Sequence, residues 1–240
     1  EAYAYATFAD RVKATHDFAR ECMEKAVEDR GRIIEMCARA DERTIGKGRG
    51  GGGEFGIRYE IAKFDEPVTI QGYEMAPPDQ TDQEGRRGVR PLPTDTEKDY
   101  EVEFWGRFEP TLSVERPLGY LIPDSHAHVV EKLRQHGITV EELDERIGVT
   151  AERYTVEEAE RARRAYQNVR RVSLECDSRK EWIAVGEGWW LVRTAQPLGD
   201  LIVYLLEPES DDGLARWDLV EPGVEAGDAW PIVRVVAFSE

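Results

Sequence analysis

The sequence has few cysteines, and its basic residues are outnumbered by its acidic ones. Its 240 residues hold only 3 cysteines, Cys22, Cys37 and Cys176, whose spacing gives neither a zinc ribbon nor a disulfide framework and leaves the redox compartment open. Lys and Arg number 32 against 49 Asp and Glu, so the net charge of −17 argues against nucleic acid and anionic membranes as partners. No apolar run approaches the roughly 20 residues that a membrane helix needs.

The first part of the chain, residues 1–45, has the apolar period of a helix. Its apolar residues recur at alternating steps of four and three and leave the opposite face charged. We predict one helix, or two, from Thr7 to about Arg43, with a break at Gly31 and one stripe that packs on a larger body. The stripe consists of Phe8, Val12, Thr15, Ala19, Cys22 and Ala26, continued by Ile33, Cys37 and Ala40.

The glycine-rich segment 46–53 follows, with the sequence GKGRGGGG. A phosphate-binding loop needs a strand before it, a helix after it and a Ser or Thr after its Lys. Here Lys47 precedes Gly48 and the order of elements is reversed. We therefore predict a flexible linker and the first domain boundary.

The residues that follow change to a period of two, which is typical of strands with one wet face. Strands are predicted at 55–61, 68–72 and 100–104, as a small antiparallel sheet. The residues between the last two strands, 76–99, are rich in Pro, Gly and charge, which predicts a long surface loop.

The last part, residues 116–240, mixes strand and helix patterns. The stretch 117–123 predicts a buried strand, 124–137 a helix that ends at Gly137, and 138–143 a second strand, which together form a βαβ unit. Residues 154–167 fit either a helix or a strand. Further strands are predicted at 169–175, 181–185, 189–193 and 231–238, with an apolar helix at 196–208 that has Pro197 in its first turn. The chain is therefore a mixed α+β protein with parts 1–45, 46–115 and 116–240.

Two polar patterns invite a metal interpretation, and a structural one is favoured for both. His128 and Glu131 have a zinc-binding spacing on one helix face, but His136 lies off that line, so we predict a solvated face. The acidic stretch 207–213, EPESDDG, departs from the calcium loop of EF-hands and is predicted to be a solvated loop.

The remaining candidates are aromatic or isolated. Trp189 and Trp190 could stack a ligand, but on a strand at least one of them belongs to the core. His16 is predicted to be structural, and no Ser-His-Asp or Cys-His set can be read from the sequence. Residue patterns alone therefore give no reaction.

Several stretches resemble the C-terminal part of bacterial zinc carboxypeptidases of the carboxypeptidase A-like family. They are EAYAYATFADRVKATHDF, RPLGYLIP, VVEKLRQHGITVEEL and WWLVRTAQPLGDLIVYLLEPESDDGLARWDL, and the likeness runs through nearly the whole chain. The resemblance implies that the helix after Thr7 is the last helix of a catalytic domain and that the rest is an extension of it.

The same resemblance implies one catalytic residue, Glu1. In the family, a Glu on a strand near the end of the catalytic domain takes a proton from the zinc-bound water that attacks the scissile carbonyl. By position in EAYAY this Glu is Glu1. The family's zinc ligands precede this Glu, so zinc is expected in the parent protein only, with no metal or other cofactor in this chain, and His128 with Glu131 is not that motif.

Two hypotheses follow. In the first, favoured also by the lack of a starting Met, the chain is the C-terminal portion of a zinc-dependent carboxypeptidase that hydrolyses peptide bonds. Its partners are then its own upstream catalytic domain and a peptide or protein substrate, and the family implies a periplasmic or secreted location. In the second, the chain is a stand-alone binding or scaffolding module. Burial of Phe8, Val12, Ala19 and Cys22 within the chain would count against the first.

Overall fold

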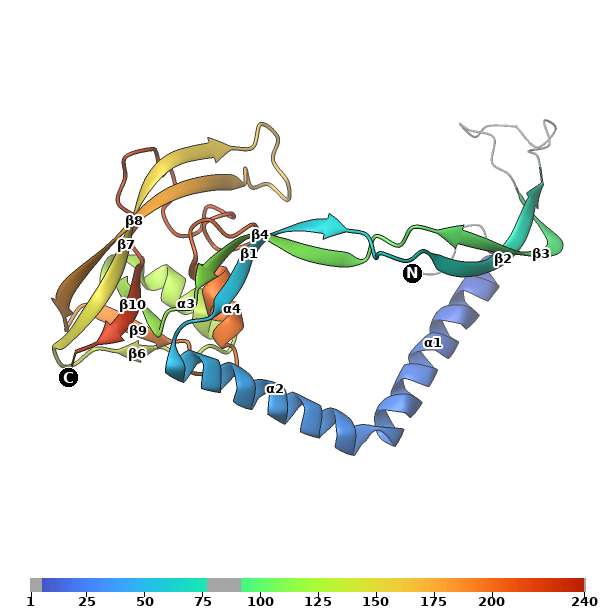
Figure 1. Cartoon of the computed structure of the whole chain (residues 1–240), viewed down its shortest axis with the longest axis horizontal. Helices are drawn as coiled ribbons and strands as arrows, with labels where there is room; N and C mark the ends of the chain where they lie inside the picture. Colours follow the sequence, from blue (N-terminus) through green and yellow to red (C-terminus); the bar gives the residue numbers. More distant parts are fainter. Residues whose placement is uncertain (1–5, 77–91, 240) are drawn as a thin grey trace. The chain divides into compact units, whose positions relative to one another are not determined.

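The computed structural model describes residues 6–76 and 92–239 (Figure 1). Their backbone contacts form two compact units, one made of Glu1–Ile57 with Ser113–Glu240 and a smaller one made of Arg58–Leu112. The helices and antiparallel sheets confirm the mixed α+β class. The predicted parts 1–45, 46–115 and 116–240 stay a prediction, because compactness does not report the origin of each part.

The N-terminal helical region consists of α1 (Phe8–Glu28) and α2 (Arg30–Gly50). The side chain of Thr7 caps α1 by accepting a hydrogen bond from the amide of Asp10 at 3.2 Å. The predicted break is confirmed, and it lies at Asp29, two residues before Gly31.

The prediction of a flexible linker over 46–53 is wrong, because α2 continues to Gly50. A Cβ atom at Gly48 would lie 2.4 Å from the backbone of Thr194 and Ala195, so glycine permits close packing there. Within the segment 46–53, positive φ angles occur at Gly51, Gly52 and Gly53, and these residues turn the chain from α2 into the next strand. Gly48 therefore permits a close contact of the helix, and Gly51, Gly52 and Gly53 form the turn that follows.

This close packing predicts opposite effects at two glycines of α2. Gly48→Ala should lower the free energy of unfolding by about 1–3 kcal/mol, because the methyl group overpacks the contact with Thr194. Gly46→Ala should raise it by about 0.5–1 kcal/mol, since nothing lies within 4 Å of that position and Ala favours a helix. Urea unfolding of both variants measures the difference, and equal effects would contradict this contact.

Strands β1 (Glu54–Ala62) and β4 (Arg107–Glu115) form one two-stranded sheet, and β2 (Val68–Ala76) and β3 (Leu92–Val102) form another. The three predicted strands are present, the third only as far as Val102, but the single small sheet predicted for them is wrong, because β1 pairs with β4 and β2 with β3. The predicted loop over 76–99 is wrong for 92–99, because β3 already pairs with β2 from Leu92 onward. The hydrogen bonds between β2 and β3 hold residues 92–99 in a strand although their composition is that of a loop. Residues 77–91 lie outside the described residues.

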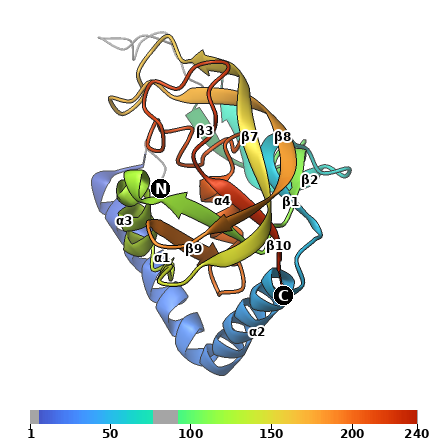
Figure 2. The same ribbon diagram turned by 90° about the vertical axis from the view of Figure 1, so that its left-hand side faces the viewer.

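The larger unit is built on a six-stranded sheet with the order β6-β9-β5-β10-β7-β8, in which all paired strands are antiparallel. The long strands β7 and β8 curve together along one side of it (Figure 2). The strands are β5 (Gly119–Pro123), β6 (Glu141–Glu142), β7 (Ile147–Arg161), β8 (Val172–Val185), β9 (Trp189–Arg193) and β10 (Val233–Phe238). The helical segments are η2 (Asp124–His126), α3 (Ala127–Gln135) and α4 (Gly199–Leu206).

The predicted βαβ unit is present as a chain order but not as a neighbouring parallel pair. Strand β9 lies between β5 and β6 and is antiparallel to both. Residues 154–161 belong to β7, so the ambiguous segment is a strand as far as Arg161. The strands predicted at 169–175 and 181–185 are one strand, β8, and Pro197 precedes α4 instead of lying in its first turn.

The two faces of the six-stranded sheet bury different kinds of residue. One face carries an apolar cluster made of Leu121, Leu143, Val149, Ala151, Val185, Leu191, Val233 and Val235. Because side chains alternate along a strand, the neighbours of these residues point to the other face. On that face, Val192, Tyr120, Arg234, Glu152 and Lys180 form one lateral row across five strands in register.

Candidate functional site

The helix α1 carries a large apolar surface that no described part of the chain covers. It has no buried residue, and Phe8 is 80% exposed and Val12 52% exposed. Ala19 and Cys22 are exposed as well, so the condition that would have counted against the enzyme-fragment hypothesis is not met. At 3.6 residues per turn, the apolar residues of α1 fall on one half of the helix, and Phe18, Met23 and Val27, each 72% exposed, widen the stripe.

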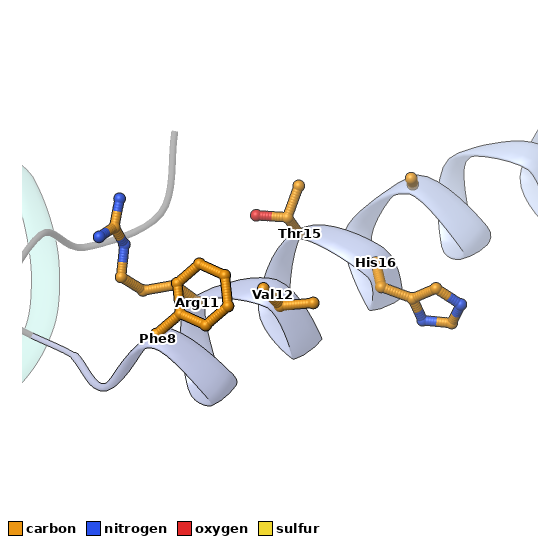
Figure 3. Close-up of a pocket in the computed structure, with 6 residues that line it drawn as sticks. Phe8, Arg11, Val12, Thr15 and His16 are labelled. Atoms are coloured by element: carbon orange, nitrogen blue, oxygen red, sulfur yellow. The ribbon is translucent and has the colours of Figure 1, made fainter.

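The start of this surface, near the N-terminus of α1, is an open hollow of about 490 Å³. Its described lining residues all belong to α1, and Figure 3 shows Phe8, Val12 and Thr15 along the helix with Arg11 and His16 at its edge. His16 is exposed and lies 3.3 Å from Asp17, so its predicted structural role is limited to this one surface contact. A face of this kind fits another protein surface better than a small molecule.

The second notable feature is a buried polar network around Glu207, at the end of α4. The carboxylate is fully buried and accepts hydrogen bonds from the hydroxyls of Tyr120 at 2.5 Å and Tyr154 at 2.8 Å. The Nε of Arg234 lies 3.1 Å from Oε1 of Glu207, and its Nη1 donates to Glu152. Two hydroxyl donors and one ion pair satisfy the buried carboxylate, so the network ties α4 to β5, β7 and β10.

Burial is the largest influence on the pKa values of the residues in this network. Burial raises the pKa of Glu207, while the charge of Arg234 and the hydroxyls of Tyr120 and Tyr154 oppose that rise. Burial and the carboxylate of Glu207 raise the pKa of both tyrosines above the ordinary value. Burial lowers the pKa of Arg234, but Glu207, the two tyrosines and Glu152 together outweigh burial and raise that pKa overall. The tyrosines therefore act as neutral hydrogen-bond donors at neutral pH.

The raised tyrosine pKa values predict a loss of stability in alkali. Above about pH 10 the unfolded chain releases the protons of Tyr120 and Tyr154, whereas the folded chain keeps them. Each tyrosine should therefore lower the free energy of unfolding by about 1.4 kcal/mol per pH unit. Urea unfolding between pH 9 and pH 11 measures the slope. It should fall by about half in Tyr120→Phe and stay unchanged in Tyr166→Phe, since Tyr166 is 53% exposed.

The structure also brings Glu221, 95 residues away in sequence, to the adjacent residues Ser125 and His126. The buried His126 has its Nδ1 2.9 Å from Ser125 Oγ and its Nε2 2.8 Å from Glu221. Ser125 and His126 are neighbours in sequence, and none of the three residues lines the pockets beside α1, beside α3 or at the end of α2. We interpret the contact as a link between η2 and the loop before β10.

His128 and Glu131 are exposed, as predicted for a solvated helix face, and both have contacts within the chain. His128 Nε2 lies 3.0 Å from the carbonyl oxygen of Leu219, and Glu131 lies 3.4 Å from Nε2 of Gln135. Nδ1 of His136 lies 2.8 Å from the carbonyl of Lys132, within its own helix. Within residues 6–76 and 92–239, no group of three His, Cys, Asp or Glu side chains is arranged to hold a metal ion.

The predictions for the other candidates have mixed outcomes. The prediction of a solvated loop over 207–213 is wrong, because Glu207, Pro208, Ser210 and Gly213 are buried and only Asp212 is exposed. Trp189 packs against the apolar cluster, and both Trp189 and Trp190 are half-buried. Glu1 lies outside the described residues. None of the helices in the described part of the chain has the length and apolar character of a membrane span.

Comparison with known proteins gives one consistent relation. Proteins named Carboxypeptidase 2 match over 139 residues, with 30% identity in Trichophyton rubrum, 29% in Trichophyton tonsurans and 28% in Trichophyton equinum. This chain is similar to fungal carboxypeptidases. The match covers 57% of this chain and 26% of each relative, so the chain spans about a quarter of the length of these carboxypeptidases. No family model matches the chain, and no solved structure gives a significant match.

The similarity to carboxypeptidases supports a peptidase-related chain, and it agrees with the sequence resemblance at this level. Sequence reasoning missed the network of Glu207 and the contact of His126. The burial of Glu207 could have been inferred, because Glu207 directly follows the apolar helix 199–206 and a solvated loop would have to begin at once after it.

Proposed function

We propose that the chain is the C-terminal portion of a carboxypeptidase-like hydrolase and acts as an accessory extension of its catalytic domain. The single observation that carries the proposal is the exposed apolar face of α1 in a chain that is similar to about a quarter of a carboxypeptidase. A soluble protein rarely leaves such a face in water, so it fits a partner. The proposed partner is the catalytic domain that precedes α1 in the parent protein.

The finer parts of the proposal rest on the family resemblance. They are the carboxypeptidase A-like class, zinc in the parent protein, a peptide or protein substrate, a periplasmic or secreted location and a general-base role for Glu1. No group of three His, Cys, Asp or Glu among the described residues is arranged to hold a metal ion, and the proposed zinc ligands belong to the part of the parent protein that precedes Glu1. The residues of this chain supply a folded extension, held together by the Glu207 network, next to the face that docks.

The test uses the natural gene product from its source cells. We expect an intact mass well above 27.3 kDa, bound zinc, and release of C-terminal amino acids from a peptide that a chelator abolishes. The chain of residues 1–240 alone should hydrolyse nothing and serves as the control. A natural product near 27.3 kDa would overturn the proposal and favour a stand-alone binding module. A longer product without zinc or peptidase activity would overturn the enzymatic part.

A further inference from the structure

The connection between β7 and β8 carries a dense group of positive charges in an acidic chain. Residues 161–171 read RARRAYQNVRR and hold five arginines with no Asp or Glu, whereas the whole chain has a net charge of −17. Strand β7 ends at Arg161 and β8 begins at Val172, so these residues form the end of the hairpin (Figure 1). The hairpin tip is defined here as Arg163, Arg164, Tyr166, Arg170 and Arg171.

A tight turn holds the hairpin tip in a defined conformation. Gln167 and Asn168 have φ angles of 50° and 67°, and positive φ at both central residues is what a type I′ hairpin turn requires. Tyr166 and Val169 flank the turn and exchange both of their backbone hydrogen bonds, at 2.9 and 3.0 Å. The backbone therefore keeps the arginines on the two sides of the turn close together.

The exposed arginines of the tip stabilise no other part of the fold. Arg163, Arg164 and Arg170 form no ion pair and no side-chain hydrogen bond with residues 6–76 and 92–239, whereas the neighbouring Arg161 pairs with Asp218 at 3.0 Å. Like charges that are held close together repel one another and lower stability. An opposite charge from outside the chain would remove this repulsion.

Aromatic side chains lie beside these arginines. Tyr166 is 53% exposed, and the guanidinium of Arg171 lies 5.1 Å from its ring centre. The ring of Trp217 lies 6.2 Å from that of Tyr166, and its Nε1 donates a hydrogen bond to Asp212 at 2.7 Å, which fixes its position. Arg, Tyr and Trp are the residues that most often supply the binding energy of protein interfaces. The tip therefore has the composition of a surface that binds another polypeptide.

The surroundings of the tip favour a short polypeptide over a nucleic acid or an anionic membrane. Exposed carboxylates flank the tip along both strands. They belong to Glu157, Glu158 and Glu160 of β7 and to Glu175 and Asp177 of β8. A long polyanion that reached the arginines would also meet these carboxylates. A short segment meets mainly the local positive charge, because salt screens charges that lie beyond about 8 Å at physiological ionic strength.

We propose that the hairpin tip is an interaction surface for an acidic segment of another protein, in which carboxylates flank an aromatic side chain. The guanidinium groups of Arg163, Arg164 and Arg170 pair with the carboxylates, which their planar geometry matches. The aromatic side chain of the segment packs on Tyr166. The inference goes beyond the proposed function and does not depend on it.

The test is a fluorescence anisotropy titration of the chain of residues 1–240 with short labelled peptides. One peptide has glutamates on both sides of a tryptophan, and its control has glutamines in their place. We expect saturable binding of the glutamate peptide, about tenfold or more tighter than that of the glutamine peptide and weaker at higher salt. Tyr166→Ala should weaken binding of the glutamate peptide about three- to tenfold, because an aromatic contact is lost.

Two sets of substitutions that remove the same charge locate the site. The first set changes the tip and consists of Arg163→Ala, Arg164→Ala and Arg170→Ala. It should raise the Kd of the glutamate peptide about tenfold or more and leave the urea midpoint unchanged, because the three side chains are exposed. The second set changes exposed arginines elsewhere in the larger unit and consists of Arg134→Ala, Arg146→Ala and Arg179→Ala. It should change the Kd by less than about twofold.

Three results would overturn the proposal. The first is the lack of saturable binding of the glutamate peptide. The second is an equal loss of binding in the two sets of arginine substitutions, which would mean that the peptide responds to overall charge. The third is binding of duplex DNA or of phosphatidylserine vesicles, titrated in parallel, as tight as that of the glutamate peptide. Each of these results would leave the proposed function unaffected, because the natural gene product is not used here.

Discussion

Replacing Glu207 by Leu should lower the free energy of unfolding by about 3–5 kcal/mol, the largest stability effect expected of a single substitution in this chain. The change leaves the guanidinium of Arg234, whose side chain is 7% exposed, without one of its two carboxylates. It also removes the acceptor of the buried hydroxyls of Tyr120 and Tyr154. Urea unfolding followed by tryptophan fluorescence measures the loss.

A matched control separates the network from the loss of any acidic residue. Glu158→Leu changes an exposed glutamate of β7 and should alter the free energy of unfolding by no more than about 0.5 kcal/mol. A second variant, Glu207→Leu with Arg234→Met, should recover part of the loss, because it removes the buried charge together with its partner. A loss below about 1 kcal/mol in Glu207→Leu would contradict the role given to the network.

The second large effect concerns α1 and should occur only in the parent protein. Phe8→Asp with Val12→Asp places carboxylates on the face that we propose to dock. In the isolated chain both positions are exposed, so the free energy of unfolding should change by no more than about 0.5 kcal/mol. In the parent protein each lost apolar contact should cost about 1.5–3 kcal/mol, which a lower melting temperature and faster proteolysis near Asp29 would report.

The opposite face of α1 provides the control for this prediction. Glu24→Gln lies among the charged residues of that face and should leave the melting temperature of the parent protein unchanged. Equal effects of Glu24→Gln and of the Phe8 and Val12 substitutions would mean that α1 does not dock through its apolar face.

Local patterns predicted most of the elements, because period and turn chemistry act over a few residues. The helix after Thr7, the break near Gly31, the strand 189–193 and the stop at Gly137, which has a φ of +82°, are of this kind. The prediction of a flexible linker over 46–53 failed, since the helix there packs through Gly48 against a segment far along the chain.

The polar network could not be predicted for the same reason. Glu207 sits in the acidic stretch EPESDDG, whereas its partners Tyr120 and Tyr154 lie 87 and 53 residues away. Only the strand order β5-β10-β7 brings these tyrosines and Arg234 beneath α4. The exposed stripe of α1, by contrast, was readable from the sequence, because it is a periodic property of one helix.

Hydrogen exchange of α1 tests the central claim most directly, by comparison of the isolated chain with the natural gene product. Without tertiary packing, a helix of 21 residues is only marginally stable in water, so the amides of Phe8–Glu28 should exchange rapidly in the isolated chain. The account predicts strong protection of the same amides in the natural product, where the catalytic domain covers them. Equal, rapid exchange in both proteins would contradict it.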